Sequence, residues 1–161
     1  SKGLRDDLAM LICQVVPDAT IAEPTRELVL PNEPSHIADV RKFVASFLAE
    51  VRASVAASQE LLLAVGEAAA NASKYGKRPE GRSEVRVRCV LEGPDVMVSV
   101  TDEGPGFDPA ALEANGLPDR FASGGRGLFL MRQFVDGFEV ESSPEGTTVR
   151  LTRRVKDDAG V

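Results

Sequence analysis

The sequence predicts an α+β domain: a two-layer sandwich with a mixed, mostly antiparallel sheet and about three helices on one of its faces. Apolar residues recur every three or four positions in the helical part of the chain, up to residue 75. The period then switches to two, as in a β-hairpin with one buried face. Runs of helices beside runs of antiparallel strands are typical of this sandwich, whereas a Rossmann-type sheet needs alternating strands and helices.

The N-terminal part of the chain is expected to hold one short helix and one strand. Apolar side chains lie at helical spacing over residues 4–16, which predicts an amphipathic helix ended by Pro17. Residues 25–30, with the sequence TRELVL, predict a strand that precedes a proline. We therefore interpret residues 1–24 as an N-terminal extension or linker helix that precedes the main domain.

Two longer helices follow, and both carry an apolar face. The first begins after Pro34, with Ser35 as its candidate N-cap, and continues to about residue 51. The second is expected over residues 58–75, with Ser58 as N-cap and Gly76 as its stop.

The C-terminal half is expected to hold two hairpins with one helix between them. A turn of Glu, Gly, Pro and Asp joins the first two strands, and a loop rich in glycine, proline and alanine follows them. The expected elements are strands over 85–91 and 96–101, a loop over 103–125, a helix from about Gly127, and strands over 138–142 and 147–155. The last residues, 156–161, are expected to form a frayed tail.

Composition excludes several classes of protein. The chain has 161 residues, of which 43% are hydrophobic and 27% charged, and this suits one globular domain. Its net charge of -6 argues against a duplex nucleic-acid binder, which usually carries a basic surplus. No stretch approaches the ~20 apolar residues that span a bilayer, so no membrane partner is expected.

The cysteines and the N-terminus indicate the compartment. Cys13 and Cys89 are far apart in the sequence, and we interpret them as buried thiols in a reducing cytoplasm. A disulfide or redox pair is the alternative. The N-terminus lacks the pattern of a signal peptide, so a cytoplasmic protein is expected. The single His36 has no partners at zinc spacing and is expected near a helix start.

One segment of the second long helix carries candidate catalytic residues. Glu67 and Asn71 are four positions apart, which places both on one face of a helix. Their neighbours are mostly alanine, so a ligand could approach this helix closely. A carboxylate can act as a general base, and an amide oxygen can bind a divalent cation. The alternative is a solvated polar stripe.

Two glycine-containing segments complete the candidate site. Asp102 ends a predicted buried strand, and Gly104 and Gly106 follow it in a D-x-G-x-G pattern that could border a pocket. Gly125 and Gly127 precede a predicted helix, where free N–H groups can bind an anion. The alternatives are a glycine turn with an exposed aspartate and a flexible loop.

In their order and spacing, these segments resemble the motifs of the Bergerat-fold ATP-binding domain, which histidine kinases and gyrase B share. More narrowly, the chain resembles the compact branch of bacterial anti-sigma factors that are serine-protein kinases. The matching motifs are Glu67-Ala68 with Asn71-Ala72, Asp102 with Gly104 and Gly106, the run from Gly125 to Met131 with Asp136 after it, and Gly146-Thr147-Thr148-Val149. The resemblance covers roughly residues 25–155, which would form a histidine-kinase-like ATPase domain.

The resemblance implies a role for each matching residue. Asn71 would hold the Mg²⁺ that bridges the phosphates of ATP, and Glu67 would be the base that activates the attacking hydroxyl. Asp102 would accept a hydrogen bond from the adenine amino group. The other binding residues would be Gly104 and Gly106 beside the adenine, Gly125, Arg126, Gly127 and Leu128 around the phosphates, and Thr147 or Thr148 at the adenine end. The register of the G-T-x-V motif favours Thr147.

The resemblance also implies an activity and partners. The chain would be a protein serine/threonine kinase that sequesters a sigma factor and phosphorylates an anti-anti-sigma antagonist of the STAS type. The alternative is a non-catalytic partner-switching module, as one domain of a larger regulator, in which ATP only orders a lid over 107–124. A homodimer is expected as well, because the strand over 26–30 would have an unpaired edge and the helix over 4–16 an uncovered apolar stripe.

Overall fold

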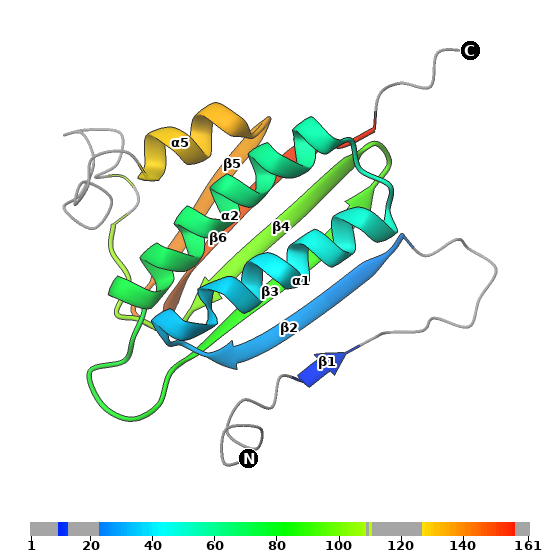
Figure 1. The fold of residues 1–161 in the computed structure, drawn as a ribbon. Helices are drawn as coiled ribbons and strands as arrows, with labels where there is room; N and C mark the ends of the chain where they lie inside the picture. The colour runs from blue at the N-terminus through cyan, green and yellow to red at the C-terminus, as the bar shows by residue number, and fades with distance from the viewer. Residues whose placement is uncertain (1–9, 13–22, 109, 111–126, 157–161) are drawn as a thin grey trace, which may run out of the picture.

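The computed structural model describes residues 10–12, 23–108, 110 and 127–156, and it confirms the expected sandwich (Figure 1). The strands are β1 (Met10–Ile12), β2 (Thr25–Pro31), β3 (Glu84–Glu92), β4 (Asp95–Asp102), β5 (Gly137–Ser143) and β6 (Gly146–Arg154). They form a six-stranded sheet in the order β1-β2-β3-β4-β6-β5, with antiparallel pairing between neighbours. The helices are the short 3-10 helix η1 (Pro34–His36), α1 (Ile37–Glu50), α2 (Val55–Tyr75) and α5 (Gly127–Phe134). The three α-helices lie on the same face of the sheet.

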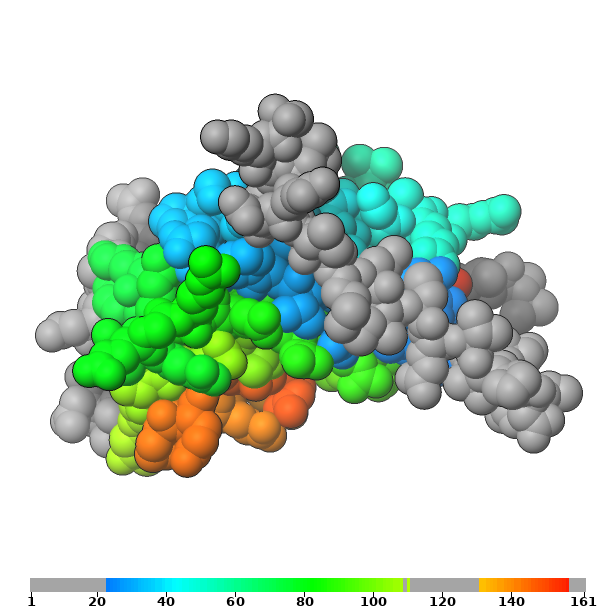
Figure 2. Space-filling model, turned by 90° about the horizontal axis from the view of Figure 1, so that it is seen from below, coloured from blue at the N-terminus to red at the C-terminus, as the bar shows by residue number. Residues whose placement is uncertain are grey.

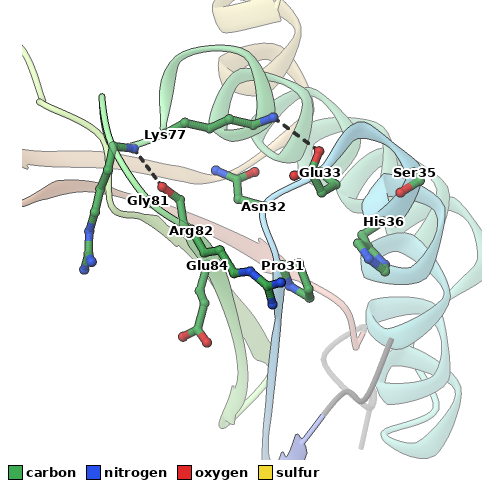
Figure 3. A pocket seen from close by; sticks show the side chains of 11 residues that line it. Pro31, Asn32, Glu33, Ser35, His36, Lys77, Gly81, Arg82 and Glu84 are labelled. Atoms are coloured by element: carbon green, nitrogen blue, oxygen red, sulfur yellow. Dashed lines mark hydrogen bonds and ion pairs between the residues drawn. The ribbon is translucent and has the colours of Figure 1, made fainter. Parts of the chain in front are cut away.

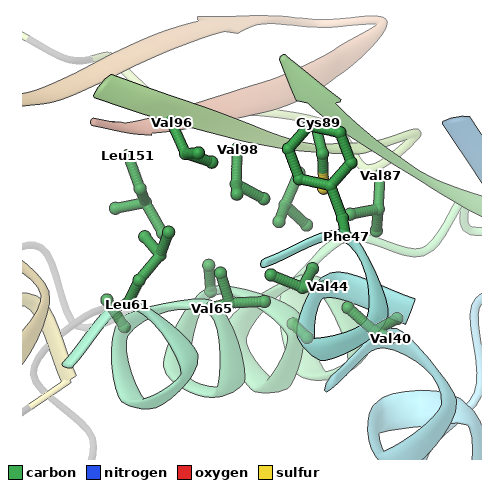
Figure 4. Close-up of a cluster of buried hydrophobic side chains, with 14 of the residues drawn as sticks. Val40, Val44, Phe47, Leu61, Val65, Val87, Cys89, Val96, Val98 and Leu151 are labelled. Atoms are coloured by element: carbon green, nitrogen blue, oxygen red, sulfur yellow. The ribbon is translucent and has the colours of Figure 1, made fainter. Parts of the chain in front are cut away.

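The hydrophobic core fills the space between the sheet and the helices (Figure 4). The strands β3 and β4 alternate buried and more exposed side chains, as the period of two in their sequences predicts. The core includes Val40, Val44 and Phe47 from α1, Leu61 and Val65 from α2, and Val87, Cys89, Val96, Val98 and Leu151 from the sheet. These contacts fix α1 and α2 on the sheet, and α2 carries the candidate catalytic residues.

Cys89 is a free, buried thiol on β3, as expected. Burial raises the pKa of this thiol to about 12. The reactive thiolate is therefore almost absent at neutral pH. Cys13 lies outside the described residues.

The ends of the helices partly correct the expected caps. The N-cap of α2 is Ser54, whose Oγ accepts a hydrogen bond from the Ala57 N–H at 3.3 Å, so the helix begins before the expected Ser58. The N–H of Ser58 already bonds within the helical turn, to the Ser54 carbonyl oxygen. Ser35 is not a cap either, because η1 leads directly into α1 there. His36 precedes α1, and Gly76 ends α2, as expected.

The strand β1 corrects the expected N-terminal helix over 4–16. Met10 lies opposite Val29 of β2 in an antiparallel ladder. A short apolar run fits a strand as well as a helix by periodicity alone, and the edge of β2 offers backbone groups for pairing. The edge of β2 is therefore paired over Glu27 to Val29, and the expectation of an unpaired strand there is wrong. The rest of the expected helix lies outside the described residues.

Candidate functional site

Asp102, Gly104, Gly106 and Thr147 lie at one end of the sandwich, where α2 and β4 end and β5 turns into β6 (Figure 1). Segments that are far apart in the sequence lie side by side here. Figure 2 shows this end at the left, with the green segment after α2 close to the orange turn between β5 and β6. The fold thus brings the D-x-G-x-G segment into contact with the end of α2.

Asp102 is the last residue of β4 and is only 4% exposed. Its Oδ1 accepts hydrogen bonds from the backbone N–H groups of Gly104 at 3.0 Å and Thr147 at 3.2 Å. Both bonds come from the main chain, so they fix the orientation of the carboxylate through the backbone. A carboxylate offers only acceptors when ionised, which suits it to recognise a donor such as an amino group.

Three glycines pack tightly at this end of the sandwich, and one of them, Gly76, lies against the carboxylate itself. A Cβ on Gly76 would lie 2.4 Å from Cβ and from Cγ of Asp102. A Cβ on Gly104 would lie 2.7 Å from Cα of Gly76, and one on Gly106 would lie 2.0 Å from the carbonyl oxygen of Ser143. Gly106 also has a φ of +72°, which side chains disfavour. The glycine spacing is therefore required by packing within the protein itself, before any ligand is considered.

The structure places Thr147, rather than Thr148, beside the buried carboxylate. Thr147 is 2% exposed, and its hydroxyl lies 2.7 Å from Oγ of Ser142 on β5. The hydroxyl of Thr148 instead lies 2.9 Å from that of Thr101. The side chains of the two threonines therefore lie on opposite faces of β6, as the alternation of side chains along a strand requires.

Glu67 and Asn71 are half-buried residues of α2. The side-chain nitrogen of Asn71, Nδ2, is buried and has no hydrogen-bond partner among the described residues. A buried polar group without a partner costs about 1–3 kcal/mol. Such a group fits a position that is completed by an oxygen of a ligand. Because Gly76 follows five residues later and touches Asp102, α2 connects this amide to the carboxylate.

The reading of the sequence missed Asn32. This residue is 3% exposed, and its Nδ2 donates hydrogen bonds to the carbonyl oxygens of Ala72 at 2.8 Å and Gly76 at 3.1 Å. It therefore caps the C-terminal end of α2 from another element. The local sequence, L-P-N-E-P, resembles an ordinary turn, because the two partners are 40 and 44 residues away.

A cavity of about 570 Å³ lies beside this end, between β2–η1 and the segment that joins α2 to β3 (Figure 3). Asn32 borders it together with Glu33, Lys77 and Arg82. Lys77 reaches across to Glu33, with Nζ 3.4 Å from Oε2. Asn32 thus stands between this cavity and the last turn of α2.

The remaining candidate residues belong to the segment before α5. Gly125 and Arg126 lie outside the described residues, as do residue 109 and residues 111–124 of the expected lid over 107–124. Gly127 and Leu128 are the first two residues of α5, as expected for a helix that begins at the glycine pair.

Two further features bear on possible ligands. Within the described part of the chain, no group of three or more His, Cys, Asp or Glu side chains is placed to hold a metal ion. None of the helices described here is both long enough and apolar enough to cross a membrane.

Comparisons with known proteins agree with this geometry. Residues 30–153 match the histidine kinase-like ATPase domain family. The serine-protein kinase RsbW of Bacillus velezensis is 29% identical over 134 residues, which are 79% of this chain and 83% of that protein. The anti-sigma F factor of Bacillus subtilis is 31% identical over 119 residues, which are 71% of this chain and 82% of that protein.

A solved structure supports the fold. The RsbU and RsbW domains of a protein from Mycobacterium tuberculosis superimpose with a TM-score of 0.64 at 23% identity. The match covers 84% of this chain and 34% of that chain, so this chain corresponds to about a third of its length. Together with the sequence matches, the chain belongs to the histidine kinase-like ATPase family, in the branch that contains anti-sigma factors and serine-protein kinases.

Proposed function

We propose that this chain is an ATP-dependent anti-sigma factor that sequesters a sigma factor and phosphorylates a serine or threonine of an anti-anti-sigma antagonist. The names of its relatives, serine-protein kinase RsbW and anti-sigma F factor, support this activity. The observation that carries the proposal is the Asp102 carboxylate, which is buried and fixed by two backbone N–H groups at the end of α2. The same helix bears Glu67 and Asn71.

Asp102 is the residue proposed to recognise the adenine base of ATP. The amino group of adenine is a donor, whereas guanine presents an oxygen at the same place, so an ionised carboxylate favours ATP over GTP. The bonds from Gly104 and Thr147 hold Oδ1 in place, so little side-chain freedom is lost when a base binds. In this proposal Thr147 and the backbone at Gly104 and Gly106 border the adenine.

Glu67 is the proposed general base. As the substrate hydroxyl oxygen forms a bond to the γ-phosphorus, the bond to the bridging oxygen of ADP breaks and the hydroxyl proton passes to the Glu67 carboxylate. Phosphoryl transfer needs little other covalent chemistry from the protein. We also propose that backbone N–H groups at Gly125 to Leu128, near the N-terminus of α5, bind the phosphates.

Asn71 is the proposed protein ligand of Mg²⁺. Its buried Nδ2 has no partner among residues 23–108 and the other described segments, which supports a ligand on this amide, and its Oδ1 is the type of oxygen that binds Mg²⁺. Mg²⁺ is commonly held by one or two protein oxygens together with phosphates and water, so a cluster of acidic side chains is not required. When bound, the ion would neutralise negative charge that develops on the phosphates.

The proposal also covers the type of antagonist, the oligomeric state, the compartment and the bounds of the ATPase domain. The resemblance to the anti-sigma branch supports an antagonist of the STAS type, a homodimer and work in the cytoplasm. It also supports residues 25–155 as the ATPase domain. Light scattering tests the assembly: a mass of about twice 17.2 kDa supports the dimer, and a monomer at all concentrations contradicts it.

Transfer of label from γ-labelled ATP to the antagonist, in the presence of Mg²⁺, tests the activity. Glu67→Gln keeps the shape of the side chain but removes the base, so it should retain ATP binding and lose roughly 10²- to 10⁴-fold in transfer rate. Glu60→Gln is the matched control, because Glu60 lies on α2 and bonds to Arg153, outside the proposed site. It should transfer label at nearly the wild-type rate. ATP-dependent binding of the antagonist without any transfer would favour the non-catalytic module instead.

A further inference from the structure

Asn32 is the buried polar side chain that links β2 to the end of α2. Its Nδ2 donates hydrogen bonds to the carbonyl oxygens of Ala72, in the last turn of α2, and of Gly76, the residue that ends the helix. The Ala72 oxygen also accepts the backbone N–H of Gly76 at 2.8 Å, so Asn32 joins an existing contact between these two residues. The backbone N–H of Asn32 bonds in turn to the carbonyl oxygen of Ser83, at 2.8 Å. The side chain therefore fixes the last turn of α2 to the sheet from a part of the chain that no motif covers.

The last turn of α2 is the wall against which Asp102 packs. Gly76 has no room for a Cβ, because one would lie 2.4 Å from the Asp102 side chain. A Cβ on Gly104, whose N–H donates a hydrogen bond to Asp102, would lie 2.7 Å from both the Tyr75 carbonyl oxygen and the Cα of Gly76. A shift of Gly76 by a few tenths of an ångström must therefore move the carboxylate or one of its donors.

We propose that Asn32 is a positioning residue of the nucleotide site, which acts through Gly76 to set the orientation of Asp102 and thereby the preference for adenine. This inference rests on the proposed function, since it assumes that Asp102 reads the base. Asn32 contacts neither the base nor the phosphates in this scheme. Its hydrogen bonds hold Gly76 in the position that leaves Asp102 only one orientation.

The cavity beside Asn32 allows the role of this residue to be tested by substitution (Figure 3). When the amide is removed, water from the cavity can solvate the two carbonyl oxygens, so the helix end is loosened without burying unpaired groups. Asn32→Ala should therefore fold. Asn32→Asp keeps the volume of the side chain but places an acceptor where both donors were, so it breaks the two hydrogen bonds and adds repulsion from the carbonyl oxygens without opening space.

Ser54 provides a control at the opposite end of the same helix. It caps α2 at its N-terminus, and caps of this kind are worth an amount similar to one or two neutral hydrogen bonds. Ser54→Ala should destabilise α2 without moving Gly76, because the two ends of a 21-residue helix are about 30 Å apart. A loss of stability alone would thus affect both variants alike.

The first measurement uses the protein without nucleotide. Amide chemical shifts of Gly104 and Thr147, which both donate to Asp102, should move in Asn32→Ala and Asn32→Asp and stay in place in Ser54→Ala. Unchanged shifts in both Asn32 variants would overturn the proposal, whatever the protein binds. If Asn32→Ala does not fold, Asn32→Ser is measured in its place, and the same outcomes apply.

The second measurement is the ratio of ATP to GTP affinity by calorimetry. The ratio should fall roughly 3- to 10-fold in Asn32→Ala, the range of one neutral hydrogen bond, and remain unchanged in Ser54→Ala. A wild-type protein that does not discriminate contradicts the proposed function. Discrimination that survives intact in both Asn32 variants contradicts only the role of Asn32.

Discussion

The two ends of the sandwich are built in different ways, although α2 and β4 run through both. At the site end, Asp102 is held by backbone N–H groups and by glycines whose absent side chains allow close contact. At the far end, Arg153 bridges Asp136, at 3.0 Å, and Glu60 on α2. The turn between β3 and β4 at that end contains Gly93, and a Cβ added to Gly93 would meet no atom within 4 Å.

This difference predicts where the molecule tolerates change. Backbone contacts at the site end cannot adjust by rotating a side chain, so one added methyl group has to displace main chain. Ion pairs at the far end join flexible, partly exposed side chains, and pairs of this kind contribute little each. Rigidity is therefore concentrated where a base would be read, whereas the ion pairs at the far end tie Glu60 of α2 and Asp136, just before β5, to β6.

The largest expected effect is a loss of stability, and a matched pair of glycine substitutions, one at each end, compares it between the two ends. Gly106 and Gly93 have φ values of +72° and +59°, so both substitutions with alanine strain the backbone similarly. The new Cβ would lie 2.0 Å from the Ser143 carbonyl oxygen in Gly106→Ala, whereas the space at Gly93 is open. Gly106→Ala should cost about 3 kcal/mol or more, and Gly93→Ala about 1 kcal/mol. Chemical denaturation measures both, and equal losses would remove the contrast between the ends.

Asp102→Asn gives the next largest effect. It keeps an oxygen for the N–H groups of Gly104 and Thr147 but removes the charge that the adenine amino group would meet. ATP affinity should fall by about 1.5–3 kcal/mol, the range for a hydrogen bond to a charged group, and the preference over GTP should narrow. Calorimetry measures both nucleotides. Unchanged ATP affinity would mean that the base is read elsewhere.

Most of the fold follows from patterns that the sequence displays locally. The switch from helical to alternating period locates α2, β3 and β4, because each element repeats its signal over several turns or residues. The error at residues 10–12 has the opposite cause, since a short apolar run carries too few repeats to distinguish a strand from a helix.

Sequence motifs name the candidate residues of the site, but the way in which the fold assembles them does not follow from the motifs. Glu67, Asn71 and Asp102 stand in recognisable motifs, whereas the tight contact of Gly76 with Asp102 depends on two segments that meet only in the folded chain. Asn32 depends on partners 40 and 44 residues away, which no local pattern can reveal. The glycines have a further reason that the motif does not reveal, which is the packing of backbone on backbone at Gly104 and Gly106.

Asn71→Ala should have a smaller effect. It should raise the stability of the protein without nucleotide and weaken the binding of ATP. The substitution removes a buried donor that has no partner in the described part of the chain and introduces the best helix former, so the free energy of unfolding without nucleotide should rise by about 1 kcal/mol. Binding of ATP with Mg²⁺ should weaken at the same time. Thermal unfolding with and without MgATP measures both quantities. A variant that loses stability without nucleotide would show that the amide already has a partner in the folded protein.

The smallest expected effect lies at the far end and depends on pH. The pKa of Asp136 is held below its ordinary value, chiefly by the hydrogen bond from the Arg154 backbone N–H, with a further contribution from Arg153 that burial opposes. A carboxyl whose folded pKa is lowered stabilises the protein above its unfolded pKa of about 4, and this contribution is lost as the pH falls through the folded pKa.

Asp136→Asn should therefore reduce the free energy of unfolding at pH 7 by less than about 1 kcal/mol, because the carboxyl is half exposed and Arg153 keeps Glu60 as a partner. The wild type and the variant should converge as the acid protonates Asp136, since the two side chains are then both neutral. Urea denaturation at pH 7 and near pH 3 measures the difference. A gap that stays constant over this range would mean that Asp136 acts through packing rather than charge, and the far end would then resemble the site end more than its ion pairs suggest.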